Sequence, residues 1–179
     1  STVVLAEGVN LDFNAIAQGT SVDLIAKLLE EKGILNYLIE VGGELKAKGI
    51  NADGNVWRVG IDKPSEELDF QNRFQFILDL KDKALATSGN YRKFYIKNGV
   101  KYAHTINPKT GFPAQNRLLS VTVVTNQCSL ADAYATAFMA MGLKKTKKII
   151  KNLGDEIEVY IVYTDKNMDW KIYISPAMK

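Results

Sequence analysis

Cysteine and histidine are almost absent from this sequence. Cys128 is the only cysteine and His104 the only histidine among 179 residues. A single cysteine cannot close an internal disulfide. One cysteine and one histidine also fall short of the four ligands that a structural zinc site requires. The sequence therefore excludes an internal disulfide and argues against structural zinc.

Long apolar runs and strong charge are missing as well. No apolar run reaches the ~18 residues of a membrane helix. No signal-peptide pattern follows Ser1, which we interpret as a processed or engineered end. The net charge is only +3, and aromatic residues do not alternate with Lys or Arg. We therefore expect no binding to nucleic acid.

The composition that remains is that of a globular protein. Apolar residues make up 46% and charged residues 24% of the sequence, both ordinary fractions. The length suffices for a sizeable core, and no repeat or linker divides the chain. We expect residues 1–179 to fold as a single unit.

Hydrophobic periodicity and turn residues predict an α+β fold with a mixed or antiparallel sheet and packed helices. Helices are predicted over 19–32, with Asn14 as N-cap and Gly33 as stop, and over 129–141 and 144–152. The turn signals include Gly42-Gly43, Asn98-Gly99 and a further turn over 87–90. Predicted strands are 2–6, 37–41, 44–50, 56–61, 74–80, 94–97, 100–104, 119–125, 158–163 and 170–175.

The segment Ser129–Thr136 allows two interpretations. In the structural one, Ser129 caps a helix, Asp132 closes a capping box, and Thr136 bonds the carbonyl four residues back. In the functional one, Asp132 and Thr136 share a helix face and offer hard oxygens to Mg²⁺ beside a phosphate. The residues alone favour the structural interpretation.

Two further segments combine helix or strand ends with polar residues. His104 ends a predicted strand before a turn dense in Asn, Pro and Gly, where an imidazole can act as a base near neutral pH. The run Asp12–Gly19 precedes the first helix and is either a plain loop or a nucleotide contact. The lysines of 144–152 are interpreted as a solvated face.

These motifs occur together in a specific order. Ala84-Leu-Ala-Thr-Ser-Gly89 is followed by His104 with Pro108-Lys-Thr-Gly111, and then by Ala131-Asp-Ala with Ala135-Thr136. With segments 11–23, 36–49 and 57–64, the chain resembles the ApbE family of FAD:protein FMN transferases, once described as thiamine-biosynthesis lipoproteins. The resemblance extends from Leu11 to Gly142.

The resemblance implies a magnesium-dependent transferase. FAD would bind with its pyrophosphate on Mg²⁺, a Thr hydroxyl of an acceptor protein would attack the FMN phosphorus, and AMP would leave. Family acceptors are subunits of respiratory redox complexes. By motif position, the metal ligands would be Asp132, Thr136 and the Ala15 carbonyl, the FAD contacts Asp12, Gln18 and Thr105, and the catalytic base His104.

The chain departs from the family pattern at several positions. Asn14-Ala15 stands where many members have two glycines, Gln18 where Lys is common, and Asn107 where Asp is frequent. Ala135 occupies the position of an acidic ligand for a second metal in some members. The resemblance also implies an upstream region that contributes to the flavin pocket, so we expect this chain to be the C-terminal part of the enzyme. Family habit implies the bacterial periplasm and a lipoprotein anchor that lies outside this chain.

Two other functions are compatible with the same motifs. The chain could be a binding module that carries FAD without transferring FMN, or a Mg²⁺-dependent pyrophosphatase in which water replaces the acceptor Thr. Release of AMP, with or without protein-bound FMN, separates the three functions.

The role of His104 is testable by substitution. A Thr hydroxyl is a weak nucleophile at neutral pH, so a base should accept its proton during attack. We expect His104→Ala in the full-length protein to retain FAD and Mg²⁺ binding and to lower the FMN transfer rate by about 10²–10⁴-fold. Single-turnover kinetics at saturating FAD measure this rate. A near-normal rate would remove His104 from the mechanism, and lost FAD binding would make it a ligand contact.

Overall fold

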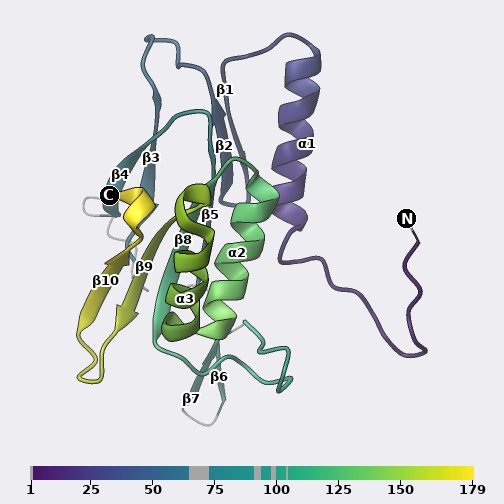
Figure 1. Ribbon diagram of the computed structural model, residues 1–179, viewed down its shortest axis with the longest axis vertical. Helices are drawn as coiled ribbons and strands as arrows, with labels where there is room; N and C mark the ends of the chain where they lie inside the picture. Colours follow the sequence, from purple (N-terminus) through teal and green to yellow (C-terminus); the bar gives the residue numbers. More distant parts are fainter. Residues whose placement is uncertain (1, 65–72, 91–93, 98–99, 104) are drawn as a thin grey trace.

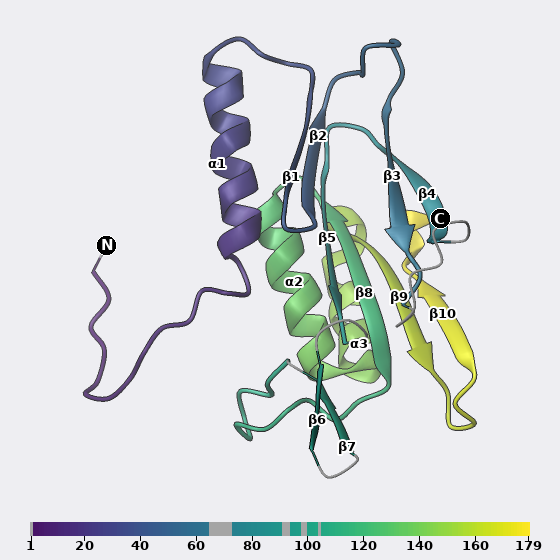
Figure 2. The ribbon, with the colours of Figure 1, turned by 180° about the vertical axis from the view of Figure 1, so that it is seen from behind.

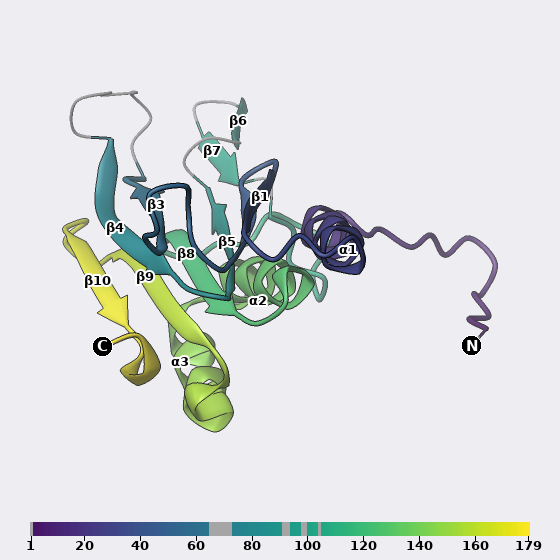
Figure 3. The same cartoon turned by 90° about the horizontal axis from the view of Figure 1, so that it is seen from above.

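The computed structural model describes residues 2–64, 73–90, 94–97, 100–103 and 105–179. Its centre is an antiparallel sheet of six strands in the order β1-β2-β5-β8-β9-β10. The hairpins β3–β4 and β6–β7 form two separate two-stranded sheets. Helices lie on one face of the large sheet, and β3–β4 lies on the other, so the fold has three layers (Figures 1 and 3). The predicted α+β class with an antiparallel sheet and packed helices is confirmed.

Most predicted elements form within two residues of their expected ends. The helices are α1 (Ala17–Glu31), α2 (Cys128–Met141) and α3 (Leu143–Leu153), with short 3₁₀ turns η1 (Gly154–Glu156) and η2 (Pro176–Met178). The strands are β1 (Tyr37–Val41), β2 (Glu44–Lys48), β3 (Trp57–Asp62), β4 (Phe74–Leu80), β5 (Ala84–Gly89), β6 (Phe94–Lys97), β7 (Val100–Ala103), β8 (Leu118–Thr125), β9 (Glu158–Thr164) and β10 (Trp170–Ile174). No helix in these described ranges is long and apolar enough to cross a membrane.

The middle of the large sheet is buried on both faces. On one side of β8, Val121 and Val123 pack with Phe138 and Met139 of α2. On the other side, Val124 packs with Leu85 and the inner residues of β3–β4. The polar residues of this strand are therefore buried as well: Ser120 and Thr122 are at most 3% exposed, and the Thr122 hydroxyl shares a hydrogen bond with the Thr87 hydroxyl at 2.8 Å.

The central strand β5 was not predicted. It lies between β2 and β8 and pairs with β8 along its whole length, from Ala84 opposite Thr125 to Gly89 opposite Ser120. The predicted turn over 87–90 is therefore wrong for its first three residues. The sequence Ala-Leu-Ala-Thr-Ser-Gly is poor in β-branched residues, and pairing on both edges overrides its local preference.

The predicted strand over 2–6 is also wrong. These residues are extended, but Val3 is 71% and Val4 91% exposed, and the segment runs away from the body of the molecule (Figure 2). A strand exists only where its N–H and C=O groups pair with a neighbouring strand. No described segment lies beside residues 2–6 to supply that pairing.

Helices α1 and α2 meet at Gly19. A Cβ atom at Gly19 would overlap the Cys128 carbonyl and lie 2.8 Å from the Ser129 Cα, so only glycine permits this approach. The amide of Gly19 donates to the Asp132 carboxylate at 3.1 Å. The N-terminal turn of α1 is thereby held directly against the N-terminal turn of α2.

The close contact at Gly19 predicts the direction in which Gly19→Ala changes the free energy of unfolding. Helix propensity alone would make Gly19→Ala stabilising by about 1 kcal/mol. Because the new methyl group would meet backbone atoms of α2, we expect the free energy of unfolding to fall by about 1–3 kcal/mol instead. Urea denaturation measures the change. Leu24→Ala on the same helix, where Leu24 is 63% exposed, is the control and should stay within about 0.5 kcal/mol of wild type. A stabilised Gly19→Ala protein would contradict the close contact.

Candidate functional site

A cavity of about 930 Å³ opens between the two helix N-termini, the sheet and the β3–β4 hairpin. Gln18 lines it from α1, Glu40 and the Gly42-Gly43 turn from β1 and β2, Ser88 from β5, and Asp132 and Thr136 from α2. Several of the segments singled out in the sequence therefore meet at one place. The volume lies in the range of cavities that hold small molecules and cofactors.

Asp132 and Thr136 lie one turn apart on the cavity side of α2. The Thr136 hydroxyl shares a hydrogen bond with the Ser88 hydroxyl at 3.2 Å. Asp132 is only 4% exposed and accepts the Gly19 N–H. Burial raises the pKa of Asp132, and the Gly19 hydrogen bond opposes that rise. The site thus contains a buried carboxylate beside a hydroxyl.

The capping-box interpretation of Ser129 and Asp132 is wrong. Helix α2 begins at Cys128, and the cap comes from another helix: Asp23 of α1 accepts the Cys128 N–H at 3.0 Å and the Ser129 N–H and hydroxyl at 2.9 Å each. Asp132 accepts from Gly19 rather than from Ser129. The Asp23 side chain of α1 thus caps α2, and the backbone N–H of Gly19 is the hydrogen-bond partner of Asp132.

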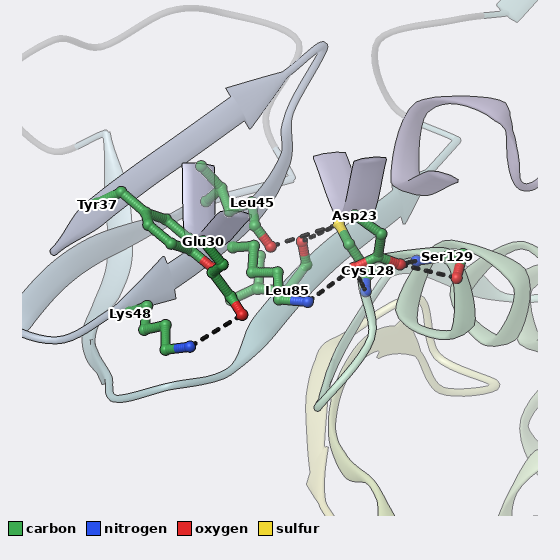
Figure 4. A network of polar contacts seen from close by, with 9 residues as sticks. Asp23, Glu30, Tyr37, Leu45, Lys48, Leu85, Cys128 and Ser129 are labelled. Atoms are coloured by element: carbon green, nitrogen blue, oxygen red, sulfur yellow. Dashed lines mark hydrogen bonds and ion pairs between the residues drawn. The ribbon is translucent and has the colours of Figure 1, made fainter. Parts of the chain in front are cut away.

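Asp23 is the centre of a polar network that joins α1, α2 and β2 (Figure 4). Lys46 of β2 donates to its carboxylate at 3.0 Å. Burial alone would raise the pKa of Asp23, but the hydrogen bonds from Ser129, Cys128 and Lys46 outweigh it, and the pKa is lowered. Burial, with Asp23 nearby, raises the pKa of the Cys128 thiol to about 12, so this cysteine is not a thiolate nucleophile at neutral pH.

Of the predicted FAD contacts, Gln18 lies in the cavity. It stands directly against Gly42, whose φ of 66° places it in the left-handed region. A Cβ atom there would overlap the Gln18 amide. The turn at Gly42 thus brings backbone close to the Gln18 side chain.

Asp12 and Asn14 contact each other before the start of α1. Asp12 is exposed and accepts hydrogen bonds from the Asn14 N–H at 2.8 Å and from the Asn14 side chain at 3.3 Å. Helix α1 begins at Ala17 after Ile16, so Asn14 as its N-cap is wrong. Asn14 instead lines the cavity, and Asp12 holds it in an Asx turn.

Thr105 is buried outside the part of the cavity formed by α1 and α2. Its hydroxyl donates to the Asn90 side chain at 3.2 Å, and the Asn90 N–H donates to the Leu119 carbonyl at 3.0 Å. These bonds tie the segment after β7 to the beginning of β8. His104 lies outside the described residues, so its role as base stays a prediction.

Three polar residues of this region carried no signal in the sequence. Asp62 and Arg73 line the cavity from the β3–β4 hairpin and form a two-pronged ion pair at 2.8 and 3.1 Å. Asp23 sits in the middle of an amphipathic helix, where a carboxylate is ordinary. Their roles depend on contacts with distant segments, which spacing within one element does not reveal.

Comparison with known proteins decides the family. The sequence profile described as "ApbE family" matches residues 2–161. The chain belongs to the ApbE family. The matched region contains every ApbE-family motif position identified above, from Asp12 to Thr136. The resemblance inferred from the motifs is confirmed.

Relatives in the ApbE family agree closely with this chain. It is 42% identical to the FAD:protein FMN transferase of Vibrio cholerae, over 94% of this chain and 49% of that protein. It is 36% identical to the enzyme of the same name from Escherichia coli K12, over 94% and 46%. The chain spans about half the length of the curated relatives it matches.

Solved ApbE structures share the fold. The flavin transferase ApbE from Vibrio cholerae superposes with a TM-score of 0.78 at 40% identity, covering 92% of this chain and 50% of that one. The ApbE protein of Thermotoga maritima superposes with a TM-score of 0.79 at 28% identity, covering 95% and 52%. The fold is thus the ApbE fold over nearly the whole of this chain.

The contributions of Asp132 and Asp23 to the free energy of unfolding should depend on pH with opposite signs. Because folding raises the pKa of Asp132, the folded state binds this proton more tightly, and Asp132 lowers the free energy of unfolding as pH rises above the ordinary value of 3.8. Because folding lowers the pKa of Asp23, Asp23 contributes stability above 3.8 that is lost as pH falls through its folded pKa.

Urea denaturation between pH 3 and 7, without divalent metal, tests both signs. We expect Asp132→Asn to gain stability relative to wild type as pH rises, and Asp23→Asn to lose stability relative to wild type over the same interval. Comparing the slopes rather than single values cancels the constant cost of each substitution. Slopes of the same sign for the two variants would contradict these assignments.

Proposed function

We propose that this chain forms the metal- and pyrophosphate-binding part of an FAD:protein FMN transferase. The observation that carries the proposal is the buried Asp132 carboxylate next to the Thr136 hydroxyl in a 930 Å³ cavity. The ApbE-family relatives named FAD:protein FMN transferase support the reaction. Because the chain spans about half of their length, the activity belongs to the protein of which this chain is a part.

The donor atoms suit Mg²⁺. Asp132 holds a carboxylate away from water, and from the described residues only the Gly19 N–H lowers its pKa. A buried carboxylate needs a countercharge. No group of three or more His, Cys, Asp or Glu that could hold a metal occurs among the described residues. One carboxylate with neutral oxygens is nevertheless sufficient for Mg²⁺, which keeps several waters or phosphate oxygens.

The Ala15 carbonyl is the third proposed ligand. In a longer helix the Gly19 N–H would donate to it, but that N–H donates to Asp132 and α1 begins only at Ala17. The carbonyl therefore stands outside the helical ladder, one turn before the residue that contacts Asp132. We propose Ala15, Asp132 and Thr136 as the ligands of one Mg²⁺ ion.

The rest of the cavity would hold the dinucleotide. The Gln18 amide can donate to a phosphate or flavin oxygen, and the Gly42-Gly43 turn presents backbone without side chains. The N-terminal turn of α1, with Ala17 and Gln18 in the lining, places the positive end of a helix at the same wall. Helix N-termini favour anionic groups such as a pyrophosphate.

In the proposed reaction a Thr hydroxyl of the acceptor protein forms a bond to the FMN-side phosphorus. The bond between that phosphorus and the bridging oxygen breaks, and AMP leaves with that oxygen. Bound Mg²⁺ would neutralise the charge of the pyrophosphate. Asp132, Thr136 and Gln18 would hold and orient the group that reacts. His104 is proposed, from its motif position, to accept the proton of the attacking hydroxyl.

One incubation separates transfer from the two alternatives. The protein is mixed with FAD, Mg²⁺ and an acceptor protein that carries a target Thr, and AMP and protein-bound FMN are measured. Equal amounts of both, abolished by EDTA, are expected. AMP with free FMN would indicate a pyrophosphatase, and bound FAD without AMP would indicate a binding module.

The metal ligands can be tested by Asp132→Ala. We expect this variant to lose the Mg²⁺-dependent part of FAD binding, measured by titration calorimetry with and without EDTA. Because the hydrogen bond from the Gly19 N–H to this carboxylate contributes only about 1.5–3 kcal/mol, the fold should remain. Asp53→Ala, in the exposed turn between β2 and β3, is the matched control and should bind as wild type. Normal Mg²⁺-dependent FAD binding by Asp132→Ala would show that Asp132 is not a metal ligand and only joins α2 to α1.

A further inference from the structure

We propose that Asp23 is a positioning residue for the metal ligands, which it holds in place without contacting the ligand cavity. The inference rests on the proposed function, since it concerns the Mg²⁺ site at Asp132 and Thr136. It assigns a role to a residue that neither the motif pattern nor the cavity singles out. The case rests on the contacts between α1, α2 and β2.

The Asp23 carboxylate accepts hydrogen bonds from residues of two other elements, α2 and β2. Oδ1 accepts from the Cys128 N–H at 3.0 Å and from Lys46 Nζ at 3.0 Å. Oδ2 accepts from the Ser129 N–H and the Ser129 hydroxyl, each at 2.9 Å. One side chain thus joins the first turn of α2, through α1, to strand β2 (Figure 4).

The contact is reciprocal. Asp23 of α1 accepts N–H groups of the first turn of α2, and Asp132 of α2 accepts the N–H of Gly19 in the first turn of α1. Gly19 and Asp23 are four residues apart on one helix, as are Cys128 and Asp132 on the other. Residues at this spacing lie on the same helix face. The two bonded sites therefore fix both the rotation and the sliding of α2 against α1.

No local substitute for Asp23 exists in the part of the chain that the structure describes. The α2 N-cap residue is Gln127, and its side chain makes no capping hydrogen bond there. Close packing of Gly19 against Cys128 and Ser129 prevents a closer approach of the helices but not their separation. If the carboxylate is replaced, the N-terminus of α2 loses its acceptors and Asp132 is no longer held at Gly19.

Lys46 of strand β2 forms an ion pair with Asp23. The Lys46 and Asp23 side chains are 20% and 22% exposed, so this ion pair is shielded from water more than a surface pair. Asn at position 23 would keep the shape of the side chain but lose this ion pair. Its amide nitrogen would also face donors where Asp23 presents an acceptor. Asp23→Asn is therefore the variant that removes positioning with the smallest change in volume.

The first readout requires no metal or substrate. We expect the Gly19 amide, which Asp23 does not touch, to exchange with D₂O at least about 10-fold faster in Asp23→Asn. Amides in the middle of α1, such as those of Ala26 and Leu29, should keep their wild-type rates. NMR-detected exchange on the isotope-labelled chain measures all of them. If Asp23 only contributes to global stability, all α1 amides accelerate together, and the inference is overturned.

The second readout is metal affinity. Outer-shell partners of a metal site typically change affinity by 10–100-fold, so we expect the half-saturating Mn²⁺ concentration in the presence of FAD to rise by that factor in Asp23→Asn. Electron paramagnetic resonance of free Mn²⁺ measures it. Glu30→Gln is the matched control, because Glu30 lies on the same helix and also bonds two elements, Tyr37 at 2.6 Å and Lys48 at 3.0 Å. It should leave Mn²⁺ affinity and Gly19 exchange unchanged.

Asp132→Ala distinguishes failure of this inference from failure of the proposed function. If Asp132→Ala leaves Mn²⁺ affinity unchanged, the metal site itself is wrong. If Asp132→Ala weakens Mn²⁺ binding while Asp23→Asn leaves both Mn²⁺ affinity and Gly19 exchange at wild-type values, the metal site stands and the positioning role of Asp23 is refuted.

Discussion

The structure depends on two carboxylates, one on each of two helices, that accept backbone N–H groups from the other helix. Asp23 of α1 caps α2, and Asp132 of α2 receives the Gly19 amide of α1. Helix ends carry N–H groups without intrahelical partners, and a buried carboxylate needs donors, so each helix supplies what the other lacks. The exchange is possible only because Gly19 has no side chain to hold the backbones apart.

The sheet provides the surface on which this helix pair rests. Small residues of β5, Ala84 and Ala86, are fully buried and let α1 and α2 approach the centre of the sheet. On the opposite face, the β3–β4 hairpin packs on Leu85 and Val124 and brings Asp62 and Arg73 to the far wall of the cavity. The cavity is thus lined by residues from all three layers, and no single segment contains it.

Local patterns predicted the ends of several elements correctly. Strands β1, β4 and β6 have the predicted ends, and α2 and α3 begin and end within a residue of them. The register of β6 and β7 pairs Lys97 with Val100, as the Asn98-Gly99 signal predicts, although that turn lies outside the described residues. The failures at 2–6 and at β5 have one cause: pairing with other strands decides whether an extended segment is a strand.

The sequence by itself determined the α+β class, most elements, the ApbE-family membership, and the helix face that carries Asp132 and Thr136. The class, the elements and the helix face follow from periodicity among neighbouring residues, and the family membership follows from the order of motifs between Leu11 and Gly142. Only the tertiary structure decided that Asp132 bonds Gly19 instead of capping its own helix, that Asn14 and Gln18 line a cavity while Asp12 turns to Asn14, and that Asp23 holds α2. Those outcomes depend on which partners the fold places beside each polar group, and partners 105 and 113 residues away leave no mark on local spacing.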